Sequence, residues 1–414
     1  MLSSSRRGVG VKVRTAAFLN PLFVYSVMWS LVLLAYQLGW SRIYAPLNSG
    51  LFLFFVATIV ISAGLGVVLQ RWLDQHRFGE SSITSSKCAQ AISAVVALAF
   101  VADFFWGGQI PLLAAFTQDD FAYAEFEGIP VLHVVIVTFS FFYAACLAYA
   151  WSRSTGRRRH VILAQLLLIL SMHLLMLSRQ AVLLILLMWA LFYLSSERLS
   201  FRRLLAAGVI GIGVAYLFGC IGNVRNGLAF NDNSYIIQLS MVSDSYPDWM
   251  PGQFLWAYMY LVSPLGNLNG LVSNFAAQQD WGGTAVNVVP DFISKRVFPD
   301  FDASTPLVVD YFNVSTGFAT AWKFGGFVGL WATFGVLIVI VMLFALIVRG
   351  PLALPTLAIL CGMTAFMFFN NALSFSGVSF ALAFPLIATS FGHLKDSRSH
   401  RTRRRGKEQG IRAD

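Results

Sequence analysis

The chain has 414 residues; 57% are apolar, only 12% are charged, and the formal net charge is +10. Soluble domains carry about 25% charged residues, so this composition excludes an ordinary soluble enzyme and predicts a membrane protein. A positive net charge is compatible with nucleic-acid binding, but the placement of the charges indicates a membrane partner and no nucleic acid. The four cysteines show no CxxC or Cys/His spacing, so we expect neither a disulfide framework nor a zinc site.

Apolar segments recur along the whole chain. A spanning helix needs about 20 mostly apolar residues. Ten segments have this character, and the first is interpreted as a retained span and not as a cleaved signal. They are Leu22–Trp40, Leu51–Leu69, Ala89–Trp106, Ile129–Trp151, Val161–Leu177, Gln180–Ser195, Leu204–Ile221, Phe327–Val348, Leu354–Leu373 and Val378–Phe391. The sequence therefore predicts an all-α polytopic membrane protein of about ten transmembrane helices.

Segment 161–195 contains two of these spans, separated only by Ser178 and Arg179. A single helix of about 35 residues would be about 50 Å long, which exceeds a hydrocarbon core of about 30 Å. Both flanks are rich in arginine, and such flanks favour the cytoplasmic side. We therefore expect two antiparallel helices, with Arg179 in a tight turn on the outer side.

The distribution of positive charge sets the expected topology. With both termini in the cytoplasm, 23 of the 29 Lys and Arg residues fall on the cytoplasmic side. The other six fall outside: Arg42, Arg179, Arg225, Lys295, Arg296 and Lys323. This bias follows the positive-inside rule, so we expect a multi-pass inner-membrane protein.

Four regions follow from this topology. Residues 1–221 hold helices one to seven, 222–326 form a long periplasmic loop, 327–394 hold helices eight to ten, and 395–414 are a basic cytoplasmic tail that contacts anionic lipid. A loop this long is usually functional. Its apolar stretch Phe254–Leu265 is too short to span, so we expect an interfacial or re-entrant helix there.

Ionisable residues inside the spans are few, and they share one depth. Asp103, His133 and His173 lie near the outer ends of three spans, and Arg225 follows the outer end of the seventh. Such groups are costly in a membrane and indicate function, although each could instead pair locally or reach the interface. Because arginine holds two phosphate oxygens at once, we predict that Arg179 and Arg225 bind a pyrophosphate group, supported by the two histidines.

A base for an attacking hydroxyl is expected among the histidines or the loop carboxylates. The candidates are His133, His173 and seven aspartates of the long loop: Asp232, Asp244, Asp248, Asp291, Asp300, Asp302 and Asp310. Among the aspartates we select Asp310, and the choice between it and the two histidines stays open. Lys323 is predicted to assist in binding pyrophosphate. No P-loop, GxGxxG, GxSxG or HExxH motif occurs, so no metal and no cofactor are expected.

Four sequence features resemble bacterial oligosaccharide repeat-unit polymerases of the Wzy type. In chain order they are Asn20-Pro21 before an aromatic-rich span, Leu177-Ser-Arg-Gln180 between two apolar helices, Arg225-Asn-Gly227 after the next span, and Asn313-Val-Ser-Thr-Gly-Phe318 leading to Trp322-Lys-Phe-Gly-Gly-Phe-Val-Gly329. The likeness covers about a third of the chain, and Lys323 stands where the family usually has an acid.

The resemblance implies a membrane enzyme that joins repeat units outside the inner membrane of a bacterium. The donor is a growing glycan on undecaprenyl pyrophosphate, and the acceptor is a single repeat unit on the same carrier. The terminal hydroxyl of the acceptor attacks the anomeric carbon of the donor, and undecaprenyl pyrophosphate leaves. The expected partners are these lipid-linked oligosaccharides, membrane lipid, a chain-length regulator and a flippase.

Three other functions stay open on the sequence. An O-antigen ligase, or another lipid-linked glycosyltransferase, would use the same donor with a different acceptor. A transporter or flippase would place its binding residues at the midplane, often on broken helices in paired repeats. Here the ionisable residues lie near one face, and no repeat is visible. A non-catalytic scaffold is the third alternative.

Overall fold

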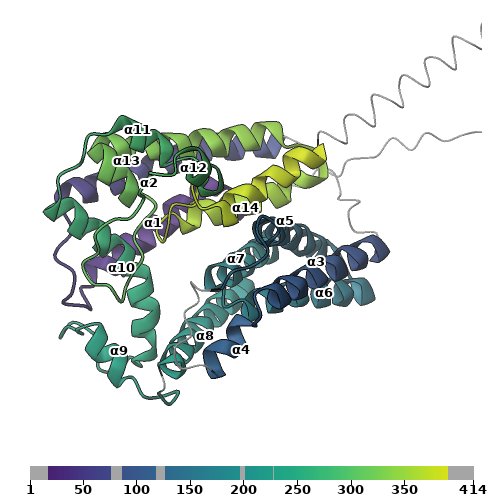
Figure 1. The fold of residues 1–414 in the computed structure, drawn as a ribbon, viewed down its shortest axis with the longest axis horizontal. Coiled ribbons are helices and arrows are strands. Elements are labelled where there is room, and N and C mark those ends of the chain that lie inside the picture. Colours follow the sequence, from purple (N-terminus) through teal and green to yellow (C-terminus); the bar gives the residue numbers. More distant parts are fainter. Residues whose placement is uncertain (1–16, 76–85, 118–125, 196–200, 227, 390–414) are drawn as a thin grey trace, which may run out of the picture.

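The structure, a computed structural model, describes residues 17–75, 86–117, 126–195, 201–226 and 228–389 (Figure 1). Within these ranges the chain is almost entirely helical, and its only strand-like contact is an isolated bridge between Ser41 and Val242. In the described part, six helices are long and apolar enough to cross a membrane: Ser49–Gln75, Lys87–Trp106, Leu132–Arg153, Gly156–Leu175, Leu204–Val224 and Ala319–Ile347. The chain is therefore a helical protein of the multi-pass membrane type. The basic tail at 395–414 lies outside the described residues.

The other four predicted spans coincide with shorter apolar helices: Pro21–Gln37, Gln180–Ser195, Gly350–Phe366 and Ser376–Thr389. The last of these begins with α15 (Ser376–Ser379). The remaining principal helices, in chain order, are α1 (Pro21–Gln37), α2 (Ser49–Gln75), α3 (Ser86–Trp106), α5 (Leu132–Arg153), α6 (Gly156–Leu175), α7 (Arg179–Ser195), α8 (Phe201–Arg225), α13 (Ala319–Ile347) and α14 (Ala353–Phe366).

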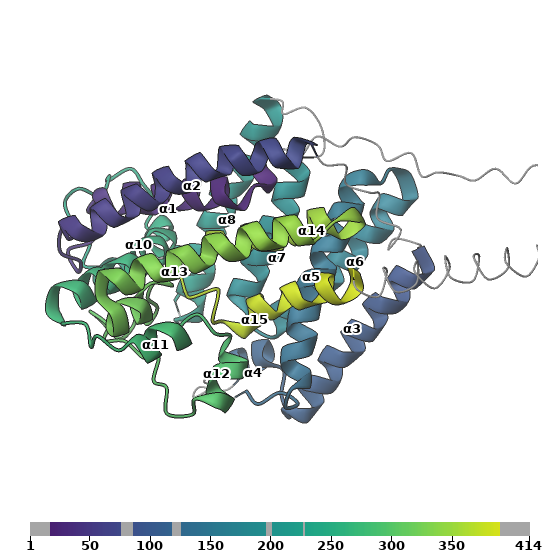
Figure 2. The same cartoon turned by 90° about the horizontal axis from the view of Figure 1, so that it is seen from above.

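The helices pack as two groups joined by α14 (Figures 1 and 2). In the first group α1, α2 and the start of α13 meet at a cluster of rings, where Trp29 stacks on Phe55 at 4.0 Å and both contact Phe318, the residue that precedes α13. The second group contains α3, α5, α6 and α7. α14 contacts α1 as well as α5 and α7, and all of its residues are buried. A helix that is apolar all round is suited to this enclosed position.

The first turns of α13 fold back on the rest of the helix at Gly326. Gly326 has φ 55° and ψ −143°, a conformation that favours glycine. A Cβ at Gly329 would collide with the carbonyl oxygen of Ala321, so this position also requires glycine. The predicted span that starts at Phe327 therefore follows a bend in a longer helix.

The segment between α8 and α13 combines helices with irregular stretches and covers one end of the bundle (Figure 1). It contains α9 (Ser234–Leu239), α10 (Gln253–Asn274), α11 (Trp281–Val286) and α12 (Asp291–Val297). The connection between α1 and α2 lies at the same end, because the N–H of Asn48 donates to Asn269 Oδ1 of α10 at 2.8 Å. We call this the loop end: α1, α3 and α8 finish there, and α2, α5 and α7 begin there.

α10 is longer than the helix predicted at Phe254–Leu265, since it runs from Gln253 to Asn274. The apolar stretch that predicted this helix ends at Leu265, before the polar residues Asn267 and Asn269. Both are buried, and their amide groups donate to backbone carbonyls of neighbouring segments. Because these polar groups are satisfied inside the protein, the helix continues through them.

Candidate active site

The loop end brings together an acid and a histidine from different helices. Asp103, in the last turn of α3, has a side chain that is 1% exposed. The Nδ1–H of His133, in the first turn of α5, donates to Asp103 Oδ2 at 2.7 Å, and the N–H of Ile129 donates to Asp103 Oδ1 at 2.7 Å. The His133 side chain is 30% exposed, and Nε2 is the ring nitrogen that the carboxylate does not hold. An imidazole oriented in this way is suited to accept a proton at Nε2.

The backbone that leads into α5 is strained. Val131 has φ 68° and ψ −49°, and the N–H of Leu132 donates to the carbonyl of Pro130, which forms a tight γ-turn. A β-branched residue with positive φ is unusual, and such strain costs about 1–3 kcal/mol. Strained residues cluster at functional sites, so this turn supports a functional role for the histidine that follows it.

Gly128 lies against the acid and the histidine. A Cβ at this position would lie 2.5 Å from His133 Nδ1 and 2.6 Å from Asp103 Oδ1. Both distances are far below an ordinary contact, so any side chain would push one of the two partners away. The position of the Asp103–His133 pair therefore depends on glycine at 128.

His173 lies deeper in the interface between α3, α5 and α6. Its side chain is fully buried, Nε2 pairs with Ser140 Oγ at 2.7 Å, and the ring stacks on Phe141 with centroids 5.1 Å apart. Phe100 contacts the ring at 5.2 Å. Nδ1 is buried and has no hydrogen-bond partner in the described part of the chain. This environment places His173 in the packing between the helices and not on the surface that a substrate would contact.

The predicted tight turn before Arg179 is present. α6 ends at Leu175 and α7 begins at Arg179. The N–H of Ser178 donates to the His173 carbonyl at 3.1 Å, and Leu177 has φ 57°, as in a Schellman motif. Glycine usually supplies this left-handed residue, so leucine is strained there. The backbone of Arg179 is thus fixed at the loop end, while its side chain lies outside the described part.

Arg225 is the last residue of α8, and its side chain also lies outside the described part. Two residues earlier, Asn223 is fully buried and joins three segments. It accepts from Trp256 Nε1 at 2.8 Å, and its amide donates to Asn233 Oδ1 at 2.9 Å and to the Phe230 carbonyl at 3.1 Å. These contacts with α10 and the 230–233 loop hold the backbone of Arg225 at the loop end.

Lys323, in the first turns of α13, and Asp310, in the loop that precedes α13, lie among different neighbours from the Asp103–His133 pair. Lys323 Nζ donates to Asp302 Oδ2 at 3.0 Å and to the carbonyls of Asp302 and Ser304, both at 2.8 Å. The Lys323 side chain is 14% exposed, and these three acceptors give it a tethering role between the loop and α13. Asp310 is exposed on a turn of the same loop.

The Lys323 tether gives an expected pH dependence. Hydrogen bonds from Ser304, and then from Lys323, lower the pKa of Asp302 to about 2. Because the pKa of Asp302 is lower in the folded state than its unfolded value of about 3.9, the carboxylate stabilises the fold at pH values above about 3.9. This stabilisation is lost as the pH falls through about 2. We expect the difference in thermal unfolding midpoint between the wild type and Asp302→Asn to stay constant from about pH 8 to about pH 5 and to shrink below about pH 4. The difference should be at most about 2 °C, because the carboxylate is exposed. A difference that disappears near pH 6 would contradict this assignment.

Compared with known proteins, the chain matches no family model, no curated protein and no solved structure. The candidate site is defined by its geometry, in which Asp103 and His133 form one pair while Arg179 and Arg225 end or begin helices on the same side. Sequence reasoning singled out these four residues but did not pair the first two. It also missed Gly128, although a Gly-Ile-Pro stretch before a helix is a turn signal.

Proposed function

We propose that the chain is a membrane glycosyltransferase that polymerises lipid-linked oligosaccharide repeat units, as in the family that it resembles. The observation that carries the proposal is the Asp103–His133 pair, an oriented base at the end of the bundle where the backbones of Arg179 and Arg225 lie. Glycosyl transfer from a pyrophosphate carrier needs a base for the acceptor hydroxyl and cations for the leaving group. The Asp103–His133 pair and the backbones of both arginines lie at the loop end, which supports the proposal.

In the proposed reaction the acceptor hydroxyl gives its proton to His133 Nε2, and its oxygen attacks the anomeric carbon of the donor glycan. The bond from that carbon to the pyrophosphate oxygen breaks, and the electron pair leaves with polyprenyl pyrophosphate. Asp103 stabilises the imidazolium that forms. Arg179 and Arg225 stabilise the negative charge that develops on the leaving group. His133 then releases its proton to water.

The proposal includes a topology of ten spans in a bacterial inner membrane, with both termini cytoplasmic and the loop end periplasmic. Its support is the charge bias of the sequence, with six of 29 Lys and Arg residues on the proposed outer side. Cysteines introduced singly at exposed positions test it. Position 244, at the loop end, should react with a membrane-impermeant thiol reagent in intact cells, and position 157, in the arginine cluster, should react only after lysis.

Gly128→Ala is expected to lower the rate of polymer formation by about 10- to 100-fold, because the added methyl group displaces His133 or Asp103. The measurement is polymer formed per minute by equal amounts of purified protein. Gly64→Ala is the matched control, since a Cβ at Gly64 meets nothing within 4 Å. Equal rates for the two variants would show that the pair tolerates displacement and is not the base.

Complementation tests the proposed function in the host. Deletion of the gene should leave single repeat units on the cell surface, and the wild-type gene should restore a ladder of polymer on a gel. If deletion abolishes surface glycan while long polymer accumulates on the lipid carrier, the chain is a ligase. If surface glycan is unchanged, the glycosyltransferase proposal is wrong, and a transporter becomes the leading alternative.

A further inference from the structure

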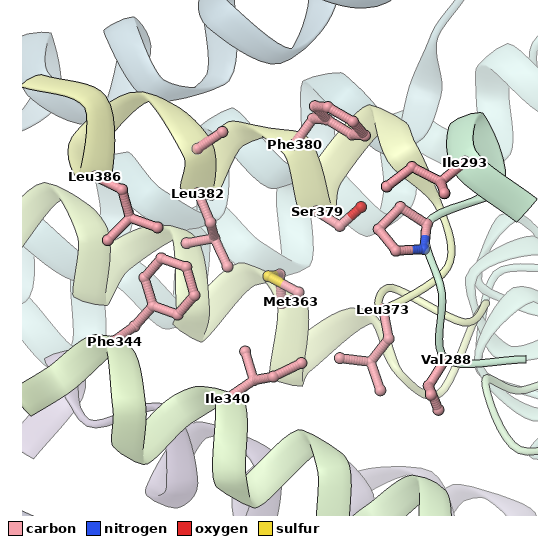
Figure 3. Close-up of a pocket in the computed structure, with 12 residues that line it drawn as sticks. Val288, Ile293, Ile340, Phe344, Met363, Leu373, Ser379, Phe380, Leu382 and Leu386 are labelled. Carbon is pink, nitrogen blue, oxygen red and sulfur yellow. The ribbon is translucent and has the colours of Figure 1, made fainter. Parts of the chain in front are cut away.

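An apolar groove runs along α13 and the last helix, Ser376–Thr389 (Figure 3). Its volume is about 270 Å³, and residues from four segments line it, among them Val288, Ile340, Phe344, Leu373, Phe380 and Leu386. Figure 3 shows Phe344 and Leu386 at one end and Val288 at the other. The groove therefore extends from the segment before α12, at the loop end, into the body of the bundle.

The chemistry of the lining selects a hydrocarbon. Ser379 is its one polar side chain, and the Ser379 hydroxyl donates to the Phe375 carbonyl at 3.1 Å. No side chain is thus left to orient a sugar or a phosphate inside the groove. A dry apolar cavity of about 150 Å³ is enough to bind benzene, so this groove has room for a longer hydrocarbon. In a bundle of membrane-spanning helices, the hydrocarbon at hand is a lipid chain.

Positive charge flanks the groove at the loop end. α12 carries Lys295 and Arg296, and both side chains are exposed; Lys295 Nζ lies 3.8 Å from Asp291 Oδ2 of the same helix, whereas Arg296 has no carboxylate partner among the described residues. The Arg296 guanidinium lies 3.9 Å from the centre of the Phe292 ring, and Phe292 contacts Phe380 of the groove lining with ring centroids 5.2 Å apart. A lipid whose chain occupies the groove would place an anionic head group near these cations.

A line of amide side chains leads from the same end of the groove towards Arg179. Asn287, adjacent to the lining, accepts from Asn371 Nδ2 at 3.0 Å, and the neighbouring Asn370 donates to Gln180 Oε1 at 2.9 Å. Gln180 directly follows Arg179 in the first turn of α7. Gln180 Nε2 and Asn370 Oδ1 are buried and lack a partner among the described residues. A short path of contacts therefore joins the mouth of the groove to the start of α7.

We propose that this groove holds the part of the donor's polyprenyl chain next to the pyrophosphate, so that the pyrophosphate lies at the loop end, where the α12 cations and Arg179 also lie. The assignment of the head group as a pyrophosphate rests on the proposed function. The assignment of the groove to a hydrocarbon chain rests on its apolar lining and its volume. The occupant is an isoprenoid carrier and not a bulk phospholipid, because the amide contacts from Asn287 to Gln180 connect the loop end of the groove to the start of α7, where Arg179 is assigned to the leaving group.

Photo-crosslinking of the full chain in nanodiscs tests whether the groove binds a polyprenyl chain, and it does not require turnover. The probe is a polyprenyl phosphate that carries a diazirine on its isoprenoid chain. Labelling is expected on peptides that contain residues 340–344 and 373–386, and unlabelled polyprenyl phosphate should compete while phosphatidylglycerol should not. Equal competition by phosphatidylglycerol, or labelling confined to other peptides, would overturn the proposal.

Two alanines of the last helix provide matched variants. Ala383 lines the groove, whereas Ala388 is exposed and does not line it. Ala383→Trp should reduce labelling by about tenfold or more, because an indole displaces several CH₂ groups and each is worth about fourfold in affinity. Ala388→Trp should label like the wild type, and Ala383→Leu, a milder change, should fall between them.

Unchanged labelling of a folded Ala383→Trp or Ala383→Leu variant would show that the chain lies elsewhere. The outcome is separable from that of the complementation test. Specific labelling of the groove in a protein whose deletion leaves surface glycan unchanged would refute the glycosyltransferase but keep the isoprenoid site. Restored polymer formation with no labelling of the groove would support the glycosyltransferase but refute the isoprenoid site.

Discussion

His133→Gln and Asp103→Asn are each expected to lower the rate of polymer formation by about 100-fold or more. Glutamine fills the space of the imidazole but cannot accept the proton, and a general base typically contributes about 100- to 10,000-fold. Asparagine keeps the shape of Asp103 but removes the charge that stabilises the imidazolium. The measurement is turnover of a defined lipid-linked repeat unit by purified protein in nanodiscs.

The control for this pair is His160→Gln. His160 is an exposed histidine of α6 that lies in the arginine-rich segment and not at the loop end. It should have wild-type turnover. If Asp103→Asn instead lowers the amount of folded protein and leaves the turnover per folded molecule unchanged, the pair is structural and the base must be sought elsewhere.

Arg179→Lys and Arg225→Lys are each expected to lower turnover by about 100-fold, with a smaller effect on the affinity for the donor. Lysine keeps the positive charge but loses the planar fork that grips two phosphate oxygens. Removing one preorganised group from a developing anion costs about 100- to 1,000-fold. Alanine at either position should reduce turnover further. Donor binding and single-turnover rates, measured separately, check this partition.

Arg42→Lys is the control for these two arginines. Arg42 belongs to the same end of the bundle, but it pairs at 2.6 Å with Asp244, whose side chain is 98% exposed. Exposed pairs contribute little, so turnover should not change. Equal losses for Arg42, Arg179 and Arg225 variants would indicate a diffuse electrostatic effect of the loop end in place of two specific contacts.

The sequence predicted the helices well because a membrane imposes a simple requirement on composition. Each predicted span falls on a helix, and the turn before Arg179 follows from the arginine-rich flanks of segment 161–195. α10 was predicted too short, because the apolar stretch ends at Leu265 while the buried partners of Asn267 and Asn269 belong to distant segments. Partners that lie far away in the chain are not visible in a local pattern.

The candidate site was only partly predicted, because contacts between distant segments are not visible in the sequence. The cost of an ionisable group in a membrane drew attention to Asp103 and His133, but the hydrogen bond between them depends on how the ends of α3 and α5 approach each other. Two motifs of the resemblance prove to have structural roles. Asn20-Pro21 caps α1, where Asn20 Oδ1 accepts from the N–H of Leu22, and the glycines near 326 form the bend in α13.

The enclosed position of α14 has a consequence for the order of assembly. α14 comes late in the chain, yet it separates α1 from α5 and α7, which are made first. The early helices therefore cannot reach their final packing until residues 353–366 have been synthesised and inserted between them. A nascent chain that stops before this point exposes apolar faces of α1 and α5 to each other or to lipid. Its release from the insertion machinery should consequently depend on the arrival of this one helix.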